Sequence, residues 1–217
     1  MKKRFELNAD YQPATFAFRD QAQVQDILSR YPNGFQRSAI MPLLDLAQRQ
    51  VAEDGAQATP PYGGWIPRAA MDEIARIVDQ PPIKVYEVAS FYSMYNMAPV
   101  GKYLVQVCTT TPCWLRGSAE IVKACEKTLG LHIGESTKDG LFTTMEVECL
   151  GACVNAPMVQ INDDFYEDLT GERTVEILQA LREGKQVPIG PQNGRKCSMA
   201  VGNPTCLEDL AKKTGAA

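Results

Sequence analysis

Four of the seven cysteines stand in two close pairs, and this arrangement constrains the fold more than any other feature of the sequence. Cys108 and Cys113 form a C-x4-C pair, and Cys149 and Cys153 form a C-x3-C pair. Each pair begins where a strand-like segment ends, so two loops can bring all four thiols together at one end of a sheet. We therefore expect metal ligation or redox chemistry at this place.

Thiolates are soft ligands that suit either an iron–sulfur cluster or zinc. A 2Fe–2S cluster takes two thiolates on each iron, which matches two loops at one rigid edge. The loop residues 109–112 (TTTP) and 150–152 (LGA) are mostly small, so backbone N–H groups can approach sulfur and tune a reduction potential. Structural zinc sites more often use tighter C-x2-C pairs. The pattern favours a 2Fe–2S cluster, with a zinc site and a thiol–disulfide function as alternatives.

Composition argues against several other classes. The odd number of cysteines, with no apolar stretch in the N-terminal MKKRFELNADYQP, argues against a secreted protein held by disulfides. The net charge is −4 and no basic run lies beyond residues 2–4, so we expect no nucleic acid as a partner. No apolar run reaches about 18 residues, so we expect no direct membrane insertion. The classes that stay compatible with the composition are a bacterial cytoplasmic protein and a processed organellar protein.

The first part of the chain shows helical periodicity interrupted by Pro and Gly. Apolar residues recur every three or four positions in four segments, and 53–64 (EDGAQATPPYGG) is typical of a surface loop. Short helices with brief connections indicate a small bundle. The expected helices are 19–31, 38–51, 67–78 and 84–95.

At Pro99 the periodicity changes to that of a compact α+β unit, with an acidic turn between its last two strands. After Pro188 the chain is rich in Gly, Pro and Asn, and we expect an extended tail. The expected strands are 103–107, 142–148, 158–161 and 165–169, and the expected helices are 115–129 and 174–182. The predicted domains are 1–98, a helical bundle that docks a partner, 99–188, the α+β domain, and 189–217, the tail.

Both cysteine pairs lie in distinctive segments, GKYLVQVCTTTPCWLRGS (101–118) and EVECLGACVNAPMVQIND (146–163). Two further segments are PPIKVYEVASFYSMYN (81–96) and FYEDLT (165–170). Together they closely resemble the thioredoxin-like 2Fe–2S subunit of the NADH-oxidising module of respiratory complex I. The match covers roughly residues 15–190.

This resemblance implies that Cys108, Cys113, Cys149 and Cys153 hold one 2Fe–2S cluster in a thioredoxin-like 2Fe–2S ferredoxin domain. It implies an electron-transfer subunit of NADH:quinone oxidoreductase, without catalytic residues or stand-alone activity. The resemblance also implies a neighbouring subunit that binds FMN and NADH, and this chain itself has no Gly-rich phosphate loop. The expected partners are that flavin- and NADH-binding subunit and the adjacent iron–sulfur subunit. The expected location is a peripheral arm on the cytoplasmic side of the bacterial inner membrane, or the mitochondrial matrix side.

The sequence departs from the family pattern at residues 51–63. Family members run almost directly from a segment like LAQRQ (46–50) into GWIP (64–67), so we expect the extra residues to form a surface loop. Related subunits serve NAD-linked hydrogenases and formate dehydrogenases, which share the ligand motif. A zinc-stabilised interaction module is the alternative outside redox chemistry.

Three cysteines and the single histidine are left outside the motif. Cys125 lies inside an expected helix and is interpreted as a buried free thiol. Cys197 and Cys206 lie in the expected tail and are interpreted as unrelated thiols, with a second site or a disulfide as the alternative. His132 has no acid or nucleophile at motif spacing and is interpreted as a surface or structural residue.

Charged and aromatic residues suggest further expectations. Glu146 and Glu148 precede the second cysteine pair, and the simplest interpretation is a solvent-facing strand. The alternative is that their charge disfavours reduction of a cluster, in which case Glu148→Gln raises its midpoint potential. Four acidic residues are expected in a solvated turn: Asp163, Asp164, Glu167 and Asp168. A cluster of aromatic and methionine side chains is equally compatible with the core and with an interface: Phe91, Tyr92, Met94, Tyr95 and Met97.

Overall fold

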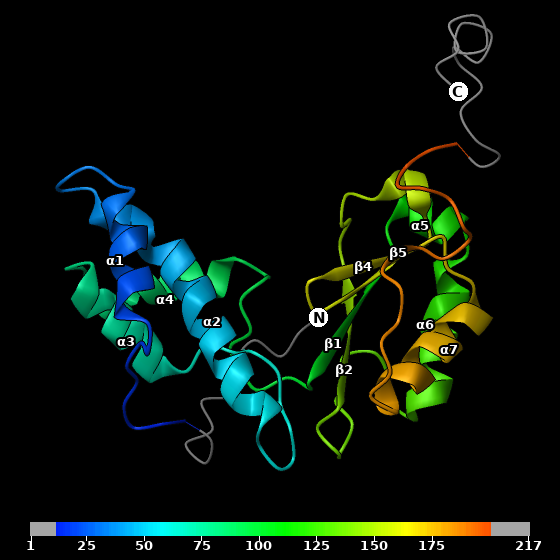
Figure 1. The fold of residues 1–217 in the computed structure, drawn as a ribbon, viewed down its shortest axis with the longest axis horizontal. Helices are drawn as coiled ribbons and strands as arrows, with labels where there is room; N and C mark the ends of the chain where they lie inside the picture. Colours follow the sequence, from blue (N-terminus) through cyan, green and yellow to red (C-terminus); the bar gives the residue numbers. More distant parts are fainter. Residues whose placement is uncertain (1–11, 201–217) are drawn as a thin grey trace, which may run out of the picture. The chain divides into compact units, whose positions relative to one another are not determined.

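The computed structural model describes residues 12–200, in which the chain forms two compact units (Figure 1). One unit, the helical unit, comprises residues 12–104 together with Gly134–Thr143. The other, the cysteine unit, comprises Val105–Ile133 and residues 144–200. Within residues 12–200, no helix is long and apolar enough to cross a membrane. Residues 1–11 and 201–217 lie outside the description, and Cys206 with them.

The helical unit contains the expected helices around one apolar core. Asp20 caps the first helix by accepting a hydrogen bond from the Gln23 N–H at 2.9 Å. Leu43, Leu44 and Ile74 are fully buried in the core between the helices. The elements are α1 (Gln21–Ser29), the 3₁₀ helix η1 (Gln36–Ala39), α2 (Ile40–Ala56), α3 (Arg68–Ile77) and α4 (Pro82–Phe91).

Helix α2 continues through half of the segment that we expected to be a surface loop. Leu43, Ala47, Val51 and Gly55 recur every four residues and are all buried, so one face of the helix keeps its contact with the core. A Cβ at Gly55 would lie 2.3 Å from the carbonyl oxygen of Tyr62, because the following turn folds back against the helix. The expectation of a loop was therefore wrong for residues 51–56, where core contacts outweigh the low helix propensity of Gly55.

Helix α4 ends at Phe91, four residues before the expected end, and the chain turns at Tyr92. The turn divides the aromatic and methionine cluster. Tyr95 and Met97 are buried, and the Tyr95 hydroxyl donates to the Met41 carbonyl at 2.9 Å. The other three members, Phe91, Tyr92 and Met94, are exposed. The cluster is thus partly core and partly surface.

A five-stranded sheet carries both cysteine pairs. Its strand order is β2-β1-β3-β4-β5, with β1 antiparallel to β3 and β3 antiparallel to β4. Val105 pairs with Ile161, and Val159 pairs with Tyr166. The strands are β1 (Tyr103–Cys108), β2 (Phe142–Val147), β3 (Val159–Ile161), β4 (Asp164–Glu167) and β5 (Gly190–Pro191).

Two helices of the cysteine unit, α6 (Ser118–Leu129) and α7 (Gly171–Arg182), pack against each other (Figure 1). Ile121, Cys125 and Leu129 form the buried face of α6. The expected helix 115–129 is interrupted, because Gly117 has a φ of +98° and separates α6 from the short helix α5 (Thr111–Leu115). A 3₁₀ turn, η2 (Cys153–Asn155), follows the second cysteine pair.

Residues 190–199, which we call the strap, differ from the expected extended tail. The strap begins as β5, which pairs in parallel with β4 through Tyr166 and Gly190. Further along, the Arg195 guanidinium forms an ion pair with Asp168, and the two side chains are only 7% and 6% exposed. Asp168 was expected in a solvated turn; that expectation was wrong because the strap covers it.

Candidate metal centre

The first cysteine loop, residues 108–113, is built into the interior. Cys108 is the last residue of β1, and Cys113 lies in α5, which begins three residues later. Each cysteine is 1% exposed, and both pack with Ala156 and Met158. The core therefore determines where these two thiols lie.

The second cysteine loop, residues 149–153, follows β2 and lies at the surface. Cys149 and Cys153 are both exposed, and their sulfur atoms are 3.3 Å apart. Gly151 has a φ of +89° and directs its N–H to the Cys149 sulfur at 3.4 Å. A residue with a Cβ is strained in this conformation, so glycine is needed to form the turn that makes this contact.

The structure brings the two loops together. The Thr110 hydroxyl lies 3.3 Å from the Cys108 sulfur and also hydrogen-bonds Cys149 of the other loop. In return, the backbone N–H of Leu150 donates to Cys108. Within the first loop, the Cys108 and Cys113 side chains hydrogen-bond each other. The two pairs thus lie in neighbouring loops that follow β1 and β2.

In each pair, one thiol pKa is lowered and the other is raised. Burial opposes ionisation of Cys108, but hydrogen bonds from Thr110 and Leu150 lower its pKa. Burial and the neighbouring Cys108 raise the pKa of Cys113 to about 12. The Gly151 N–H lowers the pKa of Cys149, whereas the hydrogen bond with Cys149 raises that of Cys153. A metal bound by both thiols of a pair would take them as thiolates, with release of their protons.

The donor set fits a 2Fe–2S cluster. Four thiols arranged as two pairs match two irons with two thiolates each, and backbone N–H groups already point at two of the sulfurs. Within residues 12–200, no three His, Cys, Asp or Glu side chains converge as they do around a single metal ion. The arrangement of the thiols as two pairs therefore suits a two-iron cluster better than a single metal ion.

Charged and apolar side chains surround the two loops. The Thr109 hydroxyl donates to the Glu146 carboxylate at 2.5 Å, which links the first loop to β2. Glu148 is exposed, consistent with a solvent-facing position. Three large apolar side chains are exposed beside the cysteines: Trp114 at 64%, Leu115 at 70% and Val154 at 68%.

The residues outside the motif stay outside the site. Cys125 is fully buried, and burial raises the pKa of its thiol to about 12, which confirms the buried free thiol. His132 is exposed and lies 3.3 Å from the Glu126 carboxylate, which confirms a surface position. Cys197 is an exposed thiol on the strap. Sequence reasoning missed Arg195, because nothing in its local sequence indicates the partner that buries it.

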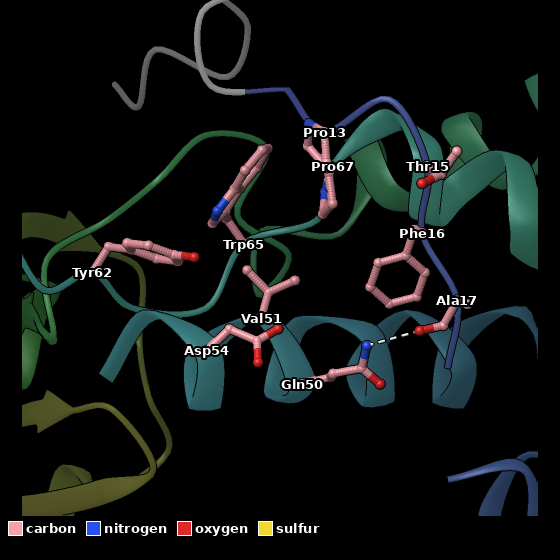
Figure 2. A pocket seen from close by; sticks show the side chains of 10 residues that line it. All are labelled: Pro13, Thr15, Phe16, Ala17, Gln50, Val51, Asp54, Tyr62, Trp65 and Pro67. Atoms are coloured by element: carbon pink, nitrogen blue, oxygen red, sulfur yellow. Dashed lines mark hydrogen bonds between the residues drawn. The ribbon is translucent and has the colours of Figure 1, made fainter. Parts of the chain in front are cut away.

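The helical unit also has a pocket of about 330 Å³ that the sequence did not indicate (Figure 2). It lies between the segment 13–17 and α2, where the Gln50 side chain donates to the Ala17 carbonyl at 3.0 Å. Arg19 forms ion pairs with Glu53 and Asp54 on the same helix. The lining residues are Pro13, Thr15, Phe16, Ala17, Gln50, Val51, Asp54, Tyr62, Trp65 and Pro67.

The fold and the four converging thiols define a thioredoxin-like protein with a paired-cysteine centre. A family model described as thioredoxin-like [2Fe-2S] ferredoxin matches residues 24–182, and the chain belongs to this family. The NADH dehydrogenase [ubiquinone] flavoprotein 2, mitochondrial, of Dictyostelium discoideum is 48% identical over 216 residues, which cover 94% of this chain and 83% of that protein. An NADH-quinone oxidoreductase subunit of Rickettsia felis is 52% identical over 164 residues, covering 76% and 92%. These relatives confirm the resemblance to a complex I subunit.

A solved structure shares the fold at much lower identity. An NAD+-reducing [NiFe]-hydrogenase in the air-oxidised state aligns with a TM-score of 0.52 and 19% identity. The alignment covers 67% of this chain and 23% of the hydrogenase chain. At this identity the likeness shows the fold alone.

Proposed function

We propose that this chain is an electron-transfer subunit of an NADH:quinone oxidoreductase, with one 2Fe–2S cluster held by Cys108, Cys113, Cys149 and Cys153. The observation that carries the proposal is the convergence of four thiols from two strand-end loops, linked across the loops by Thr110 and Leu150. Family membership and relatives at 48% and 52% identity support the complex I assignment over a hydrogenase.

The protein's own residues would hold and tune the cluster. When bound, the cluster accepts and returns one electron at a time. The buried pair, Cys108 and Cys113, ties it to the core, and the exposed pair turns its other side toward solvent or a partner. Hydrogen bonds to Cys108 and Cys149 stabilise negative charge on sulfur and so favour the reduced form.

The substrate sites would lie on other chains. FMN and NADH are assigned to a flavin- and NADH-binding partner, next to an adjacent iron–sulfur subunit, in a peripheral arm on the cytoplasmic or matrix side of the membrane. The exposed Trp114, Leu115 and Val154 beside the thiols support docking of a protein at the electron-exchange edge. The isolated chain is therefore expected to oxidise no NADH.

The first experiment is to measure the iron and sulfide content, visible absorption and electron paramagnetic resonance of the full chain. The expected result is a red-brown protein with two irons per chain and a signal that appears on one-electron reduction. Cys→Ser at each of the four positions should abolish or change the signal. Cys197→Ser, at an exposed thiol outside both loops, is the matched control and should leave it unchanged. A colourless protein with stoichiometric zinc would instead support an interaction module.

A second experiment tests the helical unit as a docking element. Phe91 is 74% exposed and Met94 53% exposed at the end of α4. Changing both to serine should reduce co-purification with the flavin- and NADH-binding subunit, while the isolated chain keeps its unfolding temperature. Phe35→Ser, at another exposed aromatic residue of the same unit, is the control. Unimpaired assembly of the Phe91 and Met94 variant would contradict docking at this surface.

A further inference from the structure

The strap reaches the second cysteine loop through one side chain. Arg195 lies 41 residues after Val154, and its Nη2 donates to the Val154 carbonyl oxygen at 3.2 Å. Val154 directly follows Cys153. A residue distant in sequence therefore fixes the backbone next to a proposed cluster ligand.

The guanidinium group of Arg195 is itself held firmly. Its Nε donates to the Asp168 Oδ2 at 3.0 Å, and its Nη2 bonds the other carboxylate oxygen. Its Nη1 donates to the Met199 carbonyl at 3.1 Å, which closes the strap on itself. Two parallel bonds between a planar guanidinium and a carboxylate fix both groups, and burial keeps water from competing.

A second set of bonds ties the strap to the turn after Cys153. The Asn155 amide, buried at 4% exposure, donates to the Cys197 carbonyl at 3.0 Å and to the Glu167 carboxylate at 2.5 Å. The Asp168 N–H donates to the Asn155 carbonyl at 2.8 Å. The turn η2 is therefore bonded both to the strap and to the residue that pairs with Arg195.

The strap contacts matter for the second cysteine loop, because its thiols are not held by burial as those of the first loop are. Cys108 and Cys113 are fixed by burial, whereas Cys149 and Cys153 are themselves exposed, although Leu150 and Ala152 between them pack against the apolar cluster around the first pair. We propose that Arg195 is a positioning residue, which holds Val154 and Asn155 so that Cys153 stays in place to ligate the cluster. This inference rests on the proposed function for the cluster, but the contacts of the strap stand independently of it.

The test compares four forms of the full chain: wild type, Arg195→Met, Arg195→Met combined with Asp168→Asn, and Arg173→Met. Arg173 bonds Gln192 of the strap at 3.0 Å, so its variant removes a side-chain bond to the strap and leaves the bonds of Arg195 in place. The double variant leaves no unpaired buried carboxylate, which separates loop positioning from the cost of an uncompensated charge. Each form is examined by chelator-induced cluster loss, the electron paramagnetic resonance spectrum, the midpoint potential and thermal unfolding.

We expect Arg195→Met to lose its cluster at least tenfold faster than wild type and to show an altered spectrum and potential. The double variant should recover thermal stability but keep the fast cluster loss, and Arg173→Met should match wild type in its cluster properties. The proposal is overturned if Arg195→Met loses its cluster no faster than wild type. It is also overturned if the double variant regains both thermal stability and slow cluster loss, or if Arg173→Met loses its cluster as fast as Arg195→Met.

Hydrogen exchange of residues 150–155 in the cluster-free chain separates this proposal from the proposed function. Loss of amide protection there in Arg195→Met, but not in Arg173→Met, supports the positioning role even if the wild type binds no cluster. Equal protection in all four forms would overturn it, whatever metal the protein holds.

Discussion

The two cysteine loops supply the same donor atoms from opposite environments. The first loop runs from a buried strand end into a short helix, and its thiols are 1% exposed. The second loop contains a glycine turn, and both of its thiols are exposed. The first pair of thiols lies within an apolar cluster. The second pair lies outside it, in a loop that packs on the cluster through Leu150 and Ala152 and receives hydrogen bonds at Cys149 from Gly151 and at Val154 from the strap.

This difference implies a division of labour. A buried pair of thiols retains a metal group against solvent, while an exposed pair leaves a short path for an electron to reach another protein. The cost is that the exposed pair needs specific hydrogen bonds in addition to the packing of Leu150 and Ala152 on the core. The following experiments probe this contrast.

Removing one thiol from each pair should have unequal consequences. Cys113→Ser is expected to leave little or no cluster in the purified protein, whereas Cys153→Ser should retain a cluster with a changed spectrum. A serine must ionise to replace a thiolate, and burial disfavours the charged form. Iron and sulfide content per chain measure the difference. Equal losses in the two variants would show that the environment of the loops does not matter for retention.

In the cluster-free chain, alkylation should separate the same two environments. The lowered pKa and exposure of Cys149 favour early reaction, whereas the pKa of Cys113 is about 12 against an ordinary 9.0. Near neutral pH this means roughly a thousandfold less thiolate at Cys113 than at an ordinary cysteine. As the pH is raised, each labelling rate should rise until the thiol is fully ionised and then level off. Cys149 should reach this plateau at lower pH than Cys113, because its pKa is lower. Peptide mass spectrometry checks this order, and earlier labelling of Cys113 would contradict it.

Truncating a side chain beside each loop should change stability unequally. Met158 is 1% exposed and packs against Cys108 and Cys113, so Met158→Ala should lower the free energy of unfolding by about 2–5 kcal/mol. Val154 is 68% exposed, and Val154→Ala should change it by less than about 0.5 kcal/mol. Urea denaturation of the cluster-free full chain provides both values. Similar losses would mean that the Val154 side chain contributes as much to stability as the buried Met158 side chain does.

The smallest effect is electrostatic. Glu148 is exposed next to Cys149, so Glu148→Gln should raise the midpoint potential by on the order of 10 mV, because removing a negative charge favours the reduced cluster. A redox titration at low salt measures the shift, and added salt should shrink it. A lower potential in the variant would refute the electrostatic hypothesis.

Local sequence was enough to predict the elements that depend on local patterns. The change of periodicity near Pro99, the strands before Cys108 and Cys149, and the small residues between the ligands all follow from neighbouring positions. The break at Gly117 was missed because apolar periodicity continues on both sides of it, although a positive φ at glycine ends one helix and starts another.

Long-range contacts account for the other differences. Helix α2 extends past Val51 because the following turn and the core supply contacts that a Gly- and Asp-containing segment does not reveal. The strap is a short parallel pairing in a Gly- and Pro-rich stretch, and its anchor is the pair of Arg195 with Asp168. Each half of that pair is an ordinary surface residue by sequence, and only the fold buries them together.

The position of Arg195 in the chain also bears on biosynthesis. A ribosome makes the polypeptide from the N-terminus, so all four cysteines are synthesised before the residue that bonds the Val154 carbonyl, 41 positions later. Both cysteine loops are therefore synthesised before Arg195 is available to bond the Val154 carbonyl. Until Arg195 has been synthesised, the Val154 carbonyl cannot receive this hydrogen bond.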